Sequence, residues 1–123
     1  MPLDSQPLTA KLGVADVRSG YQRLASLEEL PVKGRVKHVG YVQSVGYSAP
    51  GSAPLLTAVV VDRLGGRGRP AAAAHVRLKF MGQKKVPGIA PGVKVKYSGM
   101  VAPVDQVPTI FNPRYVIVPE SRQ

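Results

Sequence analysis

The segment "HVRLKFMGQKKVPGIAPGVKVKYSG", residues 75–99, contains the clearest indication of how this chain folds. Apolar and basic residues alternate near each of its ends, and two Pro-Gly pairs separate the alternating runs. Because successive side chains of a β-strand point to opposite faces, Val76, Leu78 and Phe80 are expected on one face and the basic residues on the other. The segment therefore predicts two strands joined by tight turns, each with a buried face and a cationic face.

Proline and glycine divide the remaining sequence after Pro31 into short β-branched runs, which are typical of strands. We predict five strands, over residues 32–46, 55–63, 75–81, 93–102 and 109–118. Short strands that each bury one face tend to close into a small barrel, because closure removes the exposed edges. A connecting element between the third and fourth strands is the plan of the OB fold. The predicted fold class is all-β, a five-stranded OB-fold barrel with a short N-terminal helix.

The helix is predicted over residues 9–30, where apolar residues recur at three- and four-residue steps. Pro31 is expected to end it, because the residue before a proline is disfavoured in the helical region. The chain is accordingly divided into an N-terminal leader, residues 1–30, and an OB-fold nucleic-acid-binding domain, residues 31–123. The length of 123 residues suits a single domain of ordinary size.

The formal net charge of +10 is unevenly distributed along the chain. The leader is close to neutral, whereas residues 31–123 contain fourteen lysines and arginines against three carboxylates. A field of this sign favours a polyanionic partner: nucleic acid first, an anionic membrane surface second and an acidic protein third. The alternative is a basic surface that only promotes solubility.

Several classes of protein are not expected from this composition. The chain has no cysteine and only two histidines, whose sequence neighbourhood is poor in carboxylates, so neither a disulfide framework nor a metal site is predicted. The most apolar run, residues 55–61, is far shorter than a membrane span, and no secretory signal opens the chain, so we expect a cytoplasmic protein. No paired carboxylates, phosphate loop or catalytic triad is recognisable, and neither an enzyme nor a cofactor is predicted.

Three stretches resemble a known family: "TAVVVD" at residues 57–62, the segment quoted first, and "TIFNPRYVIV" at residues 109–118. The chain resembles OB-fold domains of the anticodon-binding and helicase-wedge type, and more closely small stand-alone bacterial OB-fold nucleic-acid-binding proteins. The resemblance covers residues 32–118 and implies a nucleic-acid-binding fold without catalytic residues. The turn after Asp62 is longer and more basic than in those relatives, and the leader lacks their acidic helix.

OB folds that bind single strands combine a basic groove with aromatic platforms for the bases. The principal candidates are Arg77 and Lys79, on the cationic face of the third predicted strand. Met81 is expected either to contact a base or to cap the barrel. Lys33, Arg35 and Lys37 form a second basic row that faces either the groove or the far side of the barrel, because a bulge at Gly34 or Gly40 would reverse the register; the same two alternatives are open for Lys94 and Lys96. The predicted nucleic-acid-binding residues are Arg77, Lys79, Met81, Lys84, Lys85, Arg35, Lys37, Tyr41, Tyr47, Arg67, Arg69, Phe111 and Arg114.

The function predicted from the sequence is non-catalytic, mainly electrostatic binding of single-stranded DNA or RNA with limited base stacking. The alternative is a protein-interaction adaptor that docks an acidic partner through the same face of the barrel. Membrane association is not expected, because the chain lacks an amphipathic basic helix. We expect a monomer or a weak homodimer.

Overall fold

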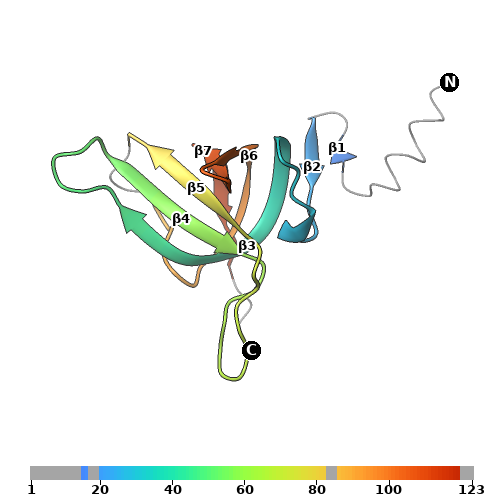
Figure 1. The fold of residues 1–123 in the computed structure, drawn as a ribbon. Helices are drawn as coiled ribbons and strands as arrows, with labels where there is room; N and C mark the ends of the chain where they lie inside the picture. Colours follow the sequence, from blue (N-terminus) through green and yellow to red (C-terminus); the bar gives the residue numbers. More distant parts are fainter. Residues whose placement is uncertain (1–14, 17–19, 83–85, 120–123) are drawn as a thin grey trace.

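The computed structural model describes residues 15–16, 20–82 and 86–119, and it confirms an all-β chain (Figure 1). Within these ranges eight strands form one sheet. Their bounds are Ala15–Asp16 (β1), Tyr21–Arg23 (β2), Gly34–Tyr47 (β3), Leu55–Val61 (β4), His75–Met81 (β5), Lys94–Val104 (β6), Val107–Phe111 (β7) and Arg114–Ile117 (β8). No helix of the described residues is long and apolar enough to cross a membrane.

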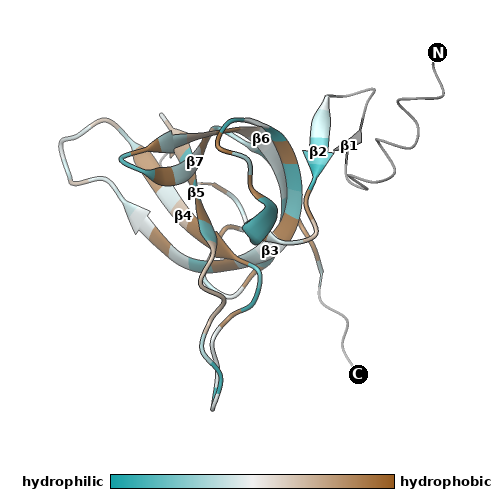
Figure 2. Cartoon of the chain, turned by 45° about the vertical axis from the view of Figure 1, so that its right-hand side comes forward, coloured by the Kyte–Doolittle hydropathy of each residue, from teal (hydrophilic) through white to brown (hydrophobic). Residues whose placement is uncertain are grey.

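The sheet curls round on itself because β3 pairs with two different strands (Figure 2). Residues 41–47 of β3 pair with β4, whereas residues 34–41 pair with β6. The order of hydrogen-bonded neighbours β3–β4–β5–β7–β6 therefore returns to β3. All of these pairings are antiparallel except β5 with β7, which is parallel.

Gly40 lies where β3 passes from one partner to the other. A Cβ atom at this position would lie 2.7 Å from the carbonyl oxygen of Val61 and 2.8 Å from a side-chain atom of Val60, which is closer than real Cβ atoms come. A β-bulge follows, because the register with β4 shifts between Val42 and Ser44. Bulges bend and twist the strand that carries them, so this part of β3 turns the sheet back on itself.

The interior of the curled sheet is filled by alternate residues of the strands, as the sequence predicted for β5. Val76, Leu78 and Phe80 are fully buried, while Arg77 and Lys79 between them point outward and are half-buried. The same alternation buries Val36 and Val42 of β3, Leu56, Ala58 and Val60 of β4, Val95, Tyr97 and Val101 of β6, and Ile110 of β7. The Phe80 ring packs edge-on against Tyr115, with centroids 5.5 Å apart.

The helix predicted over residues 9–30 is wrong for the described part of that range. Short strands β1 and β2 and a single 3₁₀ turn, η2 (Leu27–Glu29), occupy it instead. Gly20 has a φ of 76°, which a helix cannot accommodate, and β2 extends the sheet by pairing in parallel with β3. The apolar residues that suggested a helical stripe still reach the core, because Leu24 and Leu27 are 4% and 2% exposed.

The fifth predicted strand is two strands, β7 and β8, which both pair with β6. The break lies at Asn112, whose φ of 49° is in the left-handed region, and at Pro113, which has no amide hydrogen. Asn112 fastens the break to β5: its N–H donates to the carbonyl of Lys79, and its Oδ1 accepts from the N–H of Met81. The Tyr115 hydroxyl donates to the carbonyl of Pro87 and ties β8 to the connection before β6.

The remaining predicted strand bounds need smaller corrections. The first strand begins at Gly34 rather than residue 32, the second ends at Val61 rather than residue 63, and the fourth extends to Val104 rather than residue 102. The extended end of β6 pairs with β7 in a hairpin. The two turn residues of this hairpin, Asp105 and Gln106, both have positive φ. Residues with positive φ in a two-residue turn match the twist of the flanking strands.

Two glycines of β3 offer a matched test of the bend. We expect Gly40→Ala to lower the free energy of unfolding by about 1–3 kcal/mol, because the added methyl group would overlap the Val61 carbonyl. Gly46→Ala is the control, since nothing lies within 4 Å of a Cβ there and the φ of Gly46 is not positive. Urea unfolding followed by circular dichroism measures both, and equal losses for the two variants would contradict the role of Gly40.

Candidate nucleic-acid interface

The outward side chains of β5 and its neighbours form the first candidate surface, here called the β5 face. It consists of Arg77, Lys79 and Met81 of β5 with Phe111 of β7. The described residues provide no carboxylate partner for Arg77 or Lys79. The two cations are therefore held on the sheet by the alternation of β5, with their charges directed to solvent.

The register between β5 and β7 places an ammonium group beside an exposed ring. Lys79 is the direct partner of Phe111 in this parallel pair, so both side chains project from the same side of the sheet. Phe111 is 48% exposed, and Met81, which is paired with Leu55 of β4, is 49% exposed. Backbone hydrogen bonds between β5 and β7 thus hold a cation beside an exposed aromatic ring.

The same end of the sheet carries a third exposed ring. β3 ends at Tyr47, β4 begins at Leu55, and β5 ends at Met81, so these residues meet at one edge. Tyr47 is 68% exposed. It borders an open hollow of about 590 Å³ formed by the loop between β3 and β4. The β5 face thus continues into a loop that presents an aromatic side chain.

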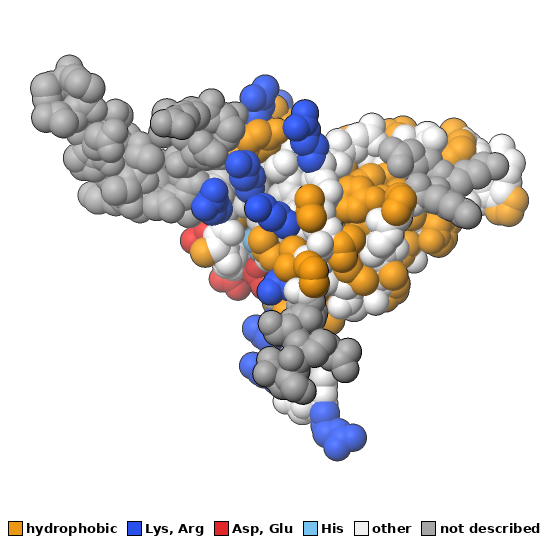
Figure 3. Space-filling model, turned by 180° about the vertical axis from the view of Figure 1, so that it is seen from behind, with side chains coloured by type: hydrophobic (Ala, Val, Ile, Leu, Met, Phe, Trp, Pro, Cys, Tyr) orange, Lys and Arg blue, Asp and Glu red, His pale blue; other side chains and the backbone are white. Residues whose placement is uncertain are grey.

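A second surface, here called the basic face, covers the outer side of β2, β3, β6 and β8. Its cations are Arg23, Arg35, Lys37, Lys94, Lys96 and Arg114. Figure 3 shows basic side chains gathered on this side of the molecule, with acidic side chains only at the border of the group. No Asp or Glu occurs in β2, β3, β6 or β8.

Cross-strand register aligns the basic face into a row. Arg23 pairs with Lys37, Lys37 with Ser98, and Ser98 with Arg114, so one row crosses four strands. Lys96 lies one step along β6, on the same side of the sheet. Two hollows, of about 370 and 230 Å³, open on either side of Lys37 and Lys96; Arg23 borders the larger and Arg114 the smaller.

The aromatic rings of the basic face differ from those of the β5 face. The Lys37 ammonium and the Arg35 guanidinium lie 5.4 and 6.0 Å from the centroid of the half-buried Tyr21 ring. The Lys94 ammonium lies 5.9 Å from the centroid of Tyr41, which is also half-buried. At these distances the rings hold the cations by cation–π attraction and are not open platforms.

The predicted binding residues that the structure describes lie on more than one surface. Arg77, Lys79, Met81 and Phe111 lie together with Tyr47 at their edge, whereas Arg35, Lys37, Tyr41 and Arg114 belong to the basic face. Arg67 and Arg69 lie on the exposed hairpin between β4 and β5, which is closed by hydrogen bonds between Gly66 and Arg69. Lys84 and Lys85 lie outside the described residues.

The prediction from sequence missed three cations of the basic face. Arg23 falls in the range that was predicted to be helical, so its place beside Lys37 was not foreseen. The alternation of Val95 and Tyr97 correctly predicted that Lys94 and Lys96 point outward, but which surface they join was left open. The register between β3 and β6, which pairs Lys96 with Val39 and Lys94 with Tyr41, decides it.

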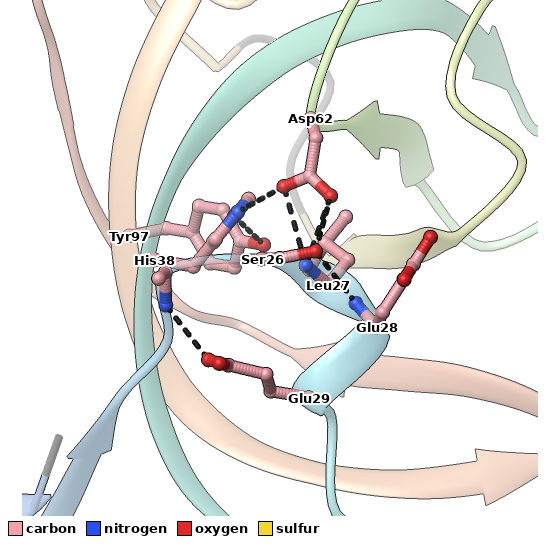
Figure 4. A network of polar contacts seen from close by, with 8 residues as sticks. Ser26, Leu27, Glu28, Glu29, His38, Asp62 and Tyr97 are labelled. Carbon is pink, nitrogen blue, oxygen red and sulfur yellow. Dashed lines mark hydrogen bonds and ion pairs between the residues drawn. The ribbon is translucent and has the colours of Figure 1, made fainter. Parts of the chain in front are cut away.

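A network of polar side chains joins the η2 turn to β3, to β6 and to the end of β4 (Figure 4). His38 is 2% exposed; its Nε2 lies 2.7 Å from Asp62 Oδ1 and its Nδ1 lies 2.8 Å from the Tyr97 hydroxyl. Asp62 also accepts hydrogen bonds from the Ser26 hydroxyl and the Leu27 N–H. Asp62 therefore joins β4 to the η2 turn and to the buried histidine.

The hydrogen bonds of this network are all satisfied by a neutral His38. An ionised carboxylate only accepts, so Nε2 carries the hydrogen that is donated to Asp62, and Nδ1 accepts from the Tyr97 hydroxyl. Burial lowers the pKa of His38, and the opposing influence of Asp62 does not reverse this. Burial tends to raise the pKa of Asp62, but its bonds to Leu27, His38 and Ser26 together lower it. Burial also raises the pKa of Tyr97 well above its usual value.

No carboxylate was expected beside either histidine, and the approach of Asp62 to His38 corrects that expectation. The Ser26 hydroxyl donates to Asp62 and not to the imidazole, so Ser26, His38 and Asp62 do not have the order of a catalytic triad. The hydroxyl that does bond to the imidazole is that of Tyr97, and this residue is 2% exposed. The network holds the η2 turn against β3 and the end of β4.

Comparison of the chain with protein-family models, with curated proteins and with solved structures gives no match. What the two faces bind is therefore inferred from their own chemistry.

The buried histidine makes stability depend on pH. Its pKa is lower in the folded chain than the value of 6.5 for a free side chain, so the unfolded chain takes up a proton first as the pH falls. We expect the free energy of unfolding to decrease between pH 7 and pH 5, by up to about 1.4 kcal/mol per pH unit. Denaturant unfolding at several pH values measures this slope.

Variants of the two histidines provide the control for this slope. His38→Gln should be less stable at pH 7 but should lose most of the dependence between pH 7 and pH 5, because it removes the buried titrating group. His75→Gln changes the exposed histidine and should retain the wild-type slope. A slope that follows His75 instead would show that His38 is not the group responsible.

Proposed function

We propose that this chain is a non-catalytic nucleic-acid-binding protein that binds single-stranded DNA or RNA through the β5 face. A single strand exposes both its phosphates and the flat faces of its bases, so a binding surface needs cations and open rings in alternation. The observation that carries the proposal is the pairing of Lys79 with Phe111 across β5 and β7. Met81 and Tyr47 add exposed, polarisable surface at the same edge.

We further propose that the curled sheet is an OB-fold barrel, as the resemblance of residues 32–118 implies. The return of the strand order β3–β4–β5–β7–β6 to β3 supports this proposal, as does the parallel pairing of β5 with β7. In OB folds the face of the second and third strands, together with the loops that flank it, binds oligonucleotides. Strands β4 and β5 occupy those places here, and the loop that follows Tyr47 borders them.

The binding is mainly electrostatic. Few open rings contribute to the β5 face, so base stacking adds a limited amount to the attraction between phosphates and cations. Arg77 and Lys79 are spaced two residues apart on β5, about 6–7 Å along the strand, which suits successive phosphates of an extended single strand. Neither side chain reads a base edge in this arrangement, so sequence preference is weak.

The salt dependence of binding tests the phosphate contacts. For Lys79→Gln we expect weaker binding of a fluorescent 12-nucleotide single strand, and a plot of log K against log salt shallower by about 0.7, the value for one phosphate on a single strand. Arg63→Gln is the matched control: it also removes one charge, but from an exposed residue after β4. Fluorescence anisotropy measures both variants.

Two results of that titration would contradict the proposal. The first is wild-type affinity that does not fall as salt rises, because phosphate contacts release counterions. The second is an equal change of slope for the two variants, which would indicate an effect of net charge alone. A chain that binds no oligonucleotide at low salt but retains an acidic protein would instead act as an adaptor.

The ring of Phe111 provides a separate test of base stacking. We expect Phe111→Ala to weaken single-strand binding by about 1–3 kcal/mol without changing the salt slope, since a ring contacts no phosphate. Phe111→Tyr keeps the ring and should bind like the wild type. An oligomer of abasic sugar-phosphate units should bind both variants equally, and a loss with that probe as well would show that the ring acts by supporting the fold.

A further inference from the structure

The basic face contains more charge than the proposed single-strand site uses. The cations of the β5 face, Arg77 and Lys79, lie on β5, whereas those of the basic face lie on β2, β3, β6 and β8, so the two sets of cations share no strand. Arg23, Arg35, Lys96 and Arg114 are all exposed, and no contact with a carboxylate joins any of them within the described residues. A concentration of like charge is held in place here by the sheet itself, at a cost in mutual repulsion.

The basic face extends in two dimensions. The row from Arg23 through Lys37 to Arg114 crosses four strands, or about 14 Å at about 4.8 Å between strands. Along β3, the distance from Arg35 to Tyr41, the partner of Lys94, is about 20 Å at about 3.3 Å per residue. A single extended strand would contact a line of such cations, whereas this area is wide enough for two lines of phosphates.

The side chains between the cations do not provide platforms for bases. The two rings of the basic face, Tyr21 and Tyr41, are half-buried beneath cations. The exposed apolar residues there have no ring: Val39 is 43% exposed, Val116 is 63% exposed, and Met100, the partner of Arg35, is 54% exposed. A single strand would gain no stacking energy on such a surface, because it offers no open ring. A duplex, whose bases are already stacked inside it, does not need such a ring in order to bind.

We infer that the basic face is a second binding site, separate from the β5 face, which contacts the two phosphate backbones of a nucleic-acid duplex without reading its sequence. The backbones of B-form DNA are separated by grooves about 6 and 12 Å wide, and both widths fall within the breadth of the row from Arg23 to Arg114. The two hollows beside Lys37 and Lys96, each bordered by an arginine, lie where a phosphate of either backbone would approach. Arg114 and Arg23 would each donate to one backbone.

A comparison of two double variants tests this inference. Arg23→Gln/Arg114→Gln removes two charges from the basic face, and Arg77→Gln/Lys79→Gln removes two charges from the β5 face. Each is titrated by fluorescence anisotropy with a 20-base-pair DNA duplex and with a 12-nucleotide single strand, at the same series of salt concentrations. Circular dichroism melting checks that both variants, whose substituted side chains point away from the core, remain folded.

We expect the basic-face variant to lose about tenfold or more in duplex affinity at low salt. Its slope for duplex binding should be shallower by about 2, because each phosphate contact contributes about 0.9 on B-form DNA. Its single-strand affinity should change much less, and the β5-face variant should show the reverse pattern. Arg23→Lys/Arg114→Lys, which retains the charges, should recover most of the duplex affinity.

Three outcomes would overturn the inference. Unchanged duplex affinity in the basic-face variant would show that Arg23 and Arg114 do not bind a duplex. An equal loss for duplex and single strand would make the basic face a part of one shared site. Binding of the wild type to vesicles of phosphatidylserine and phosphatidylcholine, lost in the basic-face variant and without any duplex binding, would assign the surface to a membrane. Failure of the single-strand proposal alone would appear only in the β5-face variant, so the two failures are distinguishable.

Discussion

The closure of the curled sheet depends on one bent strand, β3. β3 pairs with β4 through residues 41–47 and with β6 through residues 34–41, and the change of partner is possible only because Gly40 lacks a side chain where the carbonyl of Val61 approaches. The bend curls the sheet and creates an interior that the apolar residues of every second position fill. It also directs the two halves of β3 toward different surfaces of the molecule.

The fastening between Asp62 and the η2 turn has a consequence for the surface. Asp62 holds Ser26 and Leu27 against the end of β4, and the neutral His38 beneath it completes the set of hydrogen bonds. With Leu27 buried and η2 fixed, the chain before it runs along β3 as β2. Arg23 thereby becomes part of the basic face. The residues that Asp62 holds, Ser26 and Leu27, lie three and four positions after Arg23 in the chain.

The separation of rings from cations gives the two faces different chemistry. On the β5 face a lysine lies beside an open phenylalanine, an arrangement that suits a ligand with both phosphates and accessible bases. On the basic face the rings lie beneath the cations, and the cations spread over four strands. This difference in chemistry is the basis on which we propose a single-strand site on one face and a duplex site on the other.

The sequence by itself determined the alternation and therefore the all-β class. The pattern "HVRLKFM" correctly predicted which side chains of β5 are buried, because a period of two has only one arrangement that buries its apolar members. The candidate cations were also recognised from the sequence, since charge is a property of residue type. The sequence could not show which of these cations share a surface, and the described ones lie on two faces and on the hairpin between β4 and β5.

Only the tertiary structure decided those groupings. The position of Arg23 beside Lys37, and of Lys79 beside Phe111, depends on the register between strands that are distant in the sequence. The helix predicted before Pro31 failed for a related reason: the apolar spacing of Leu24 and Leu27 also suits a short turn that is held over the core by Asp62. Local patterns specify what each residue prefers, whereas pairing between distant strands specifies which residues it meets.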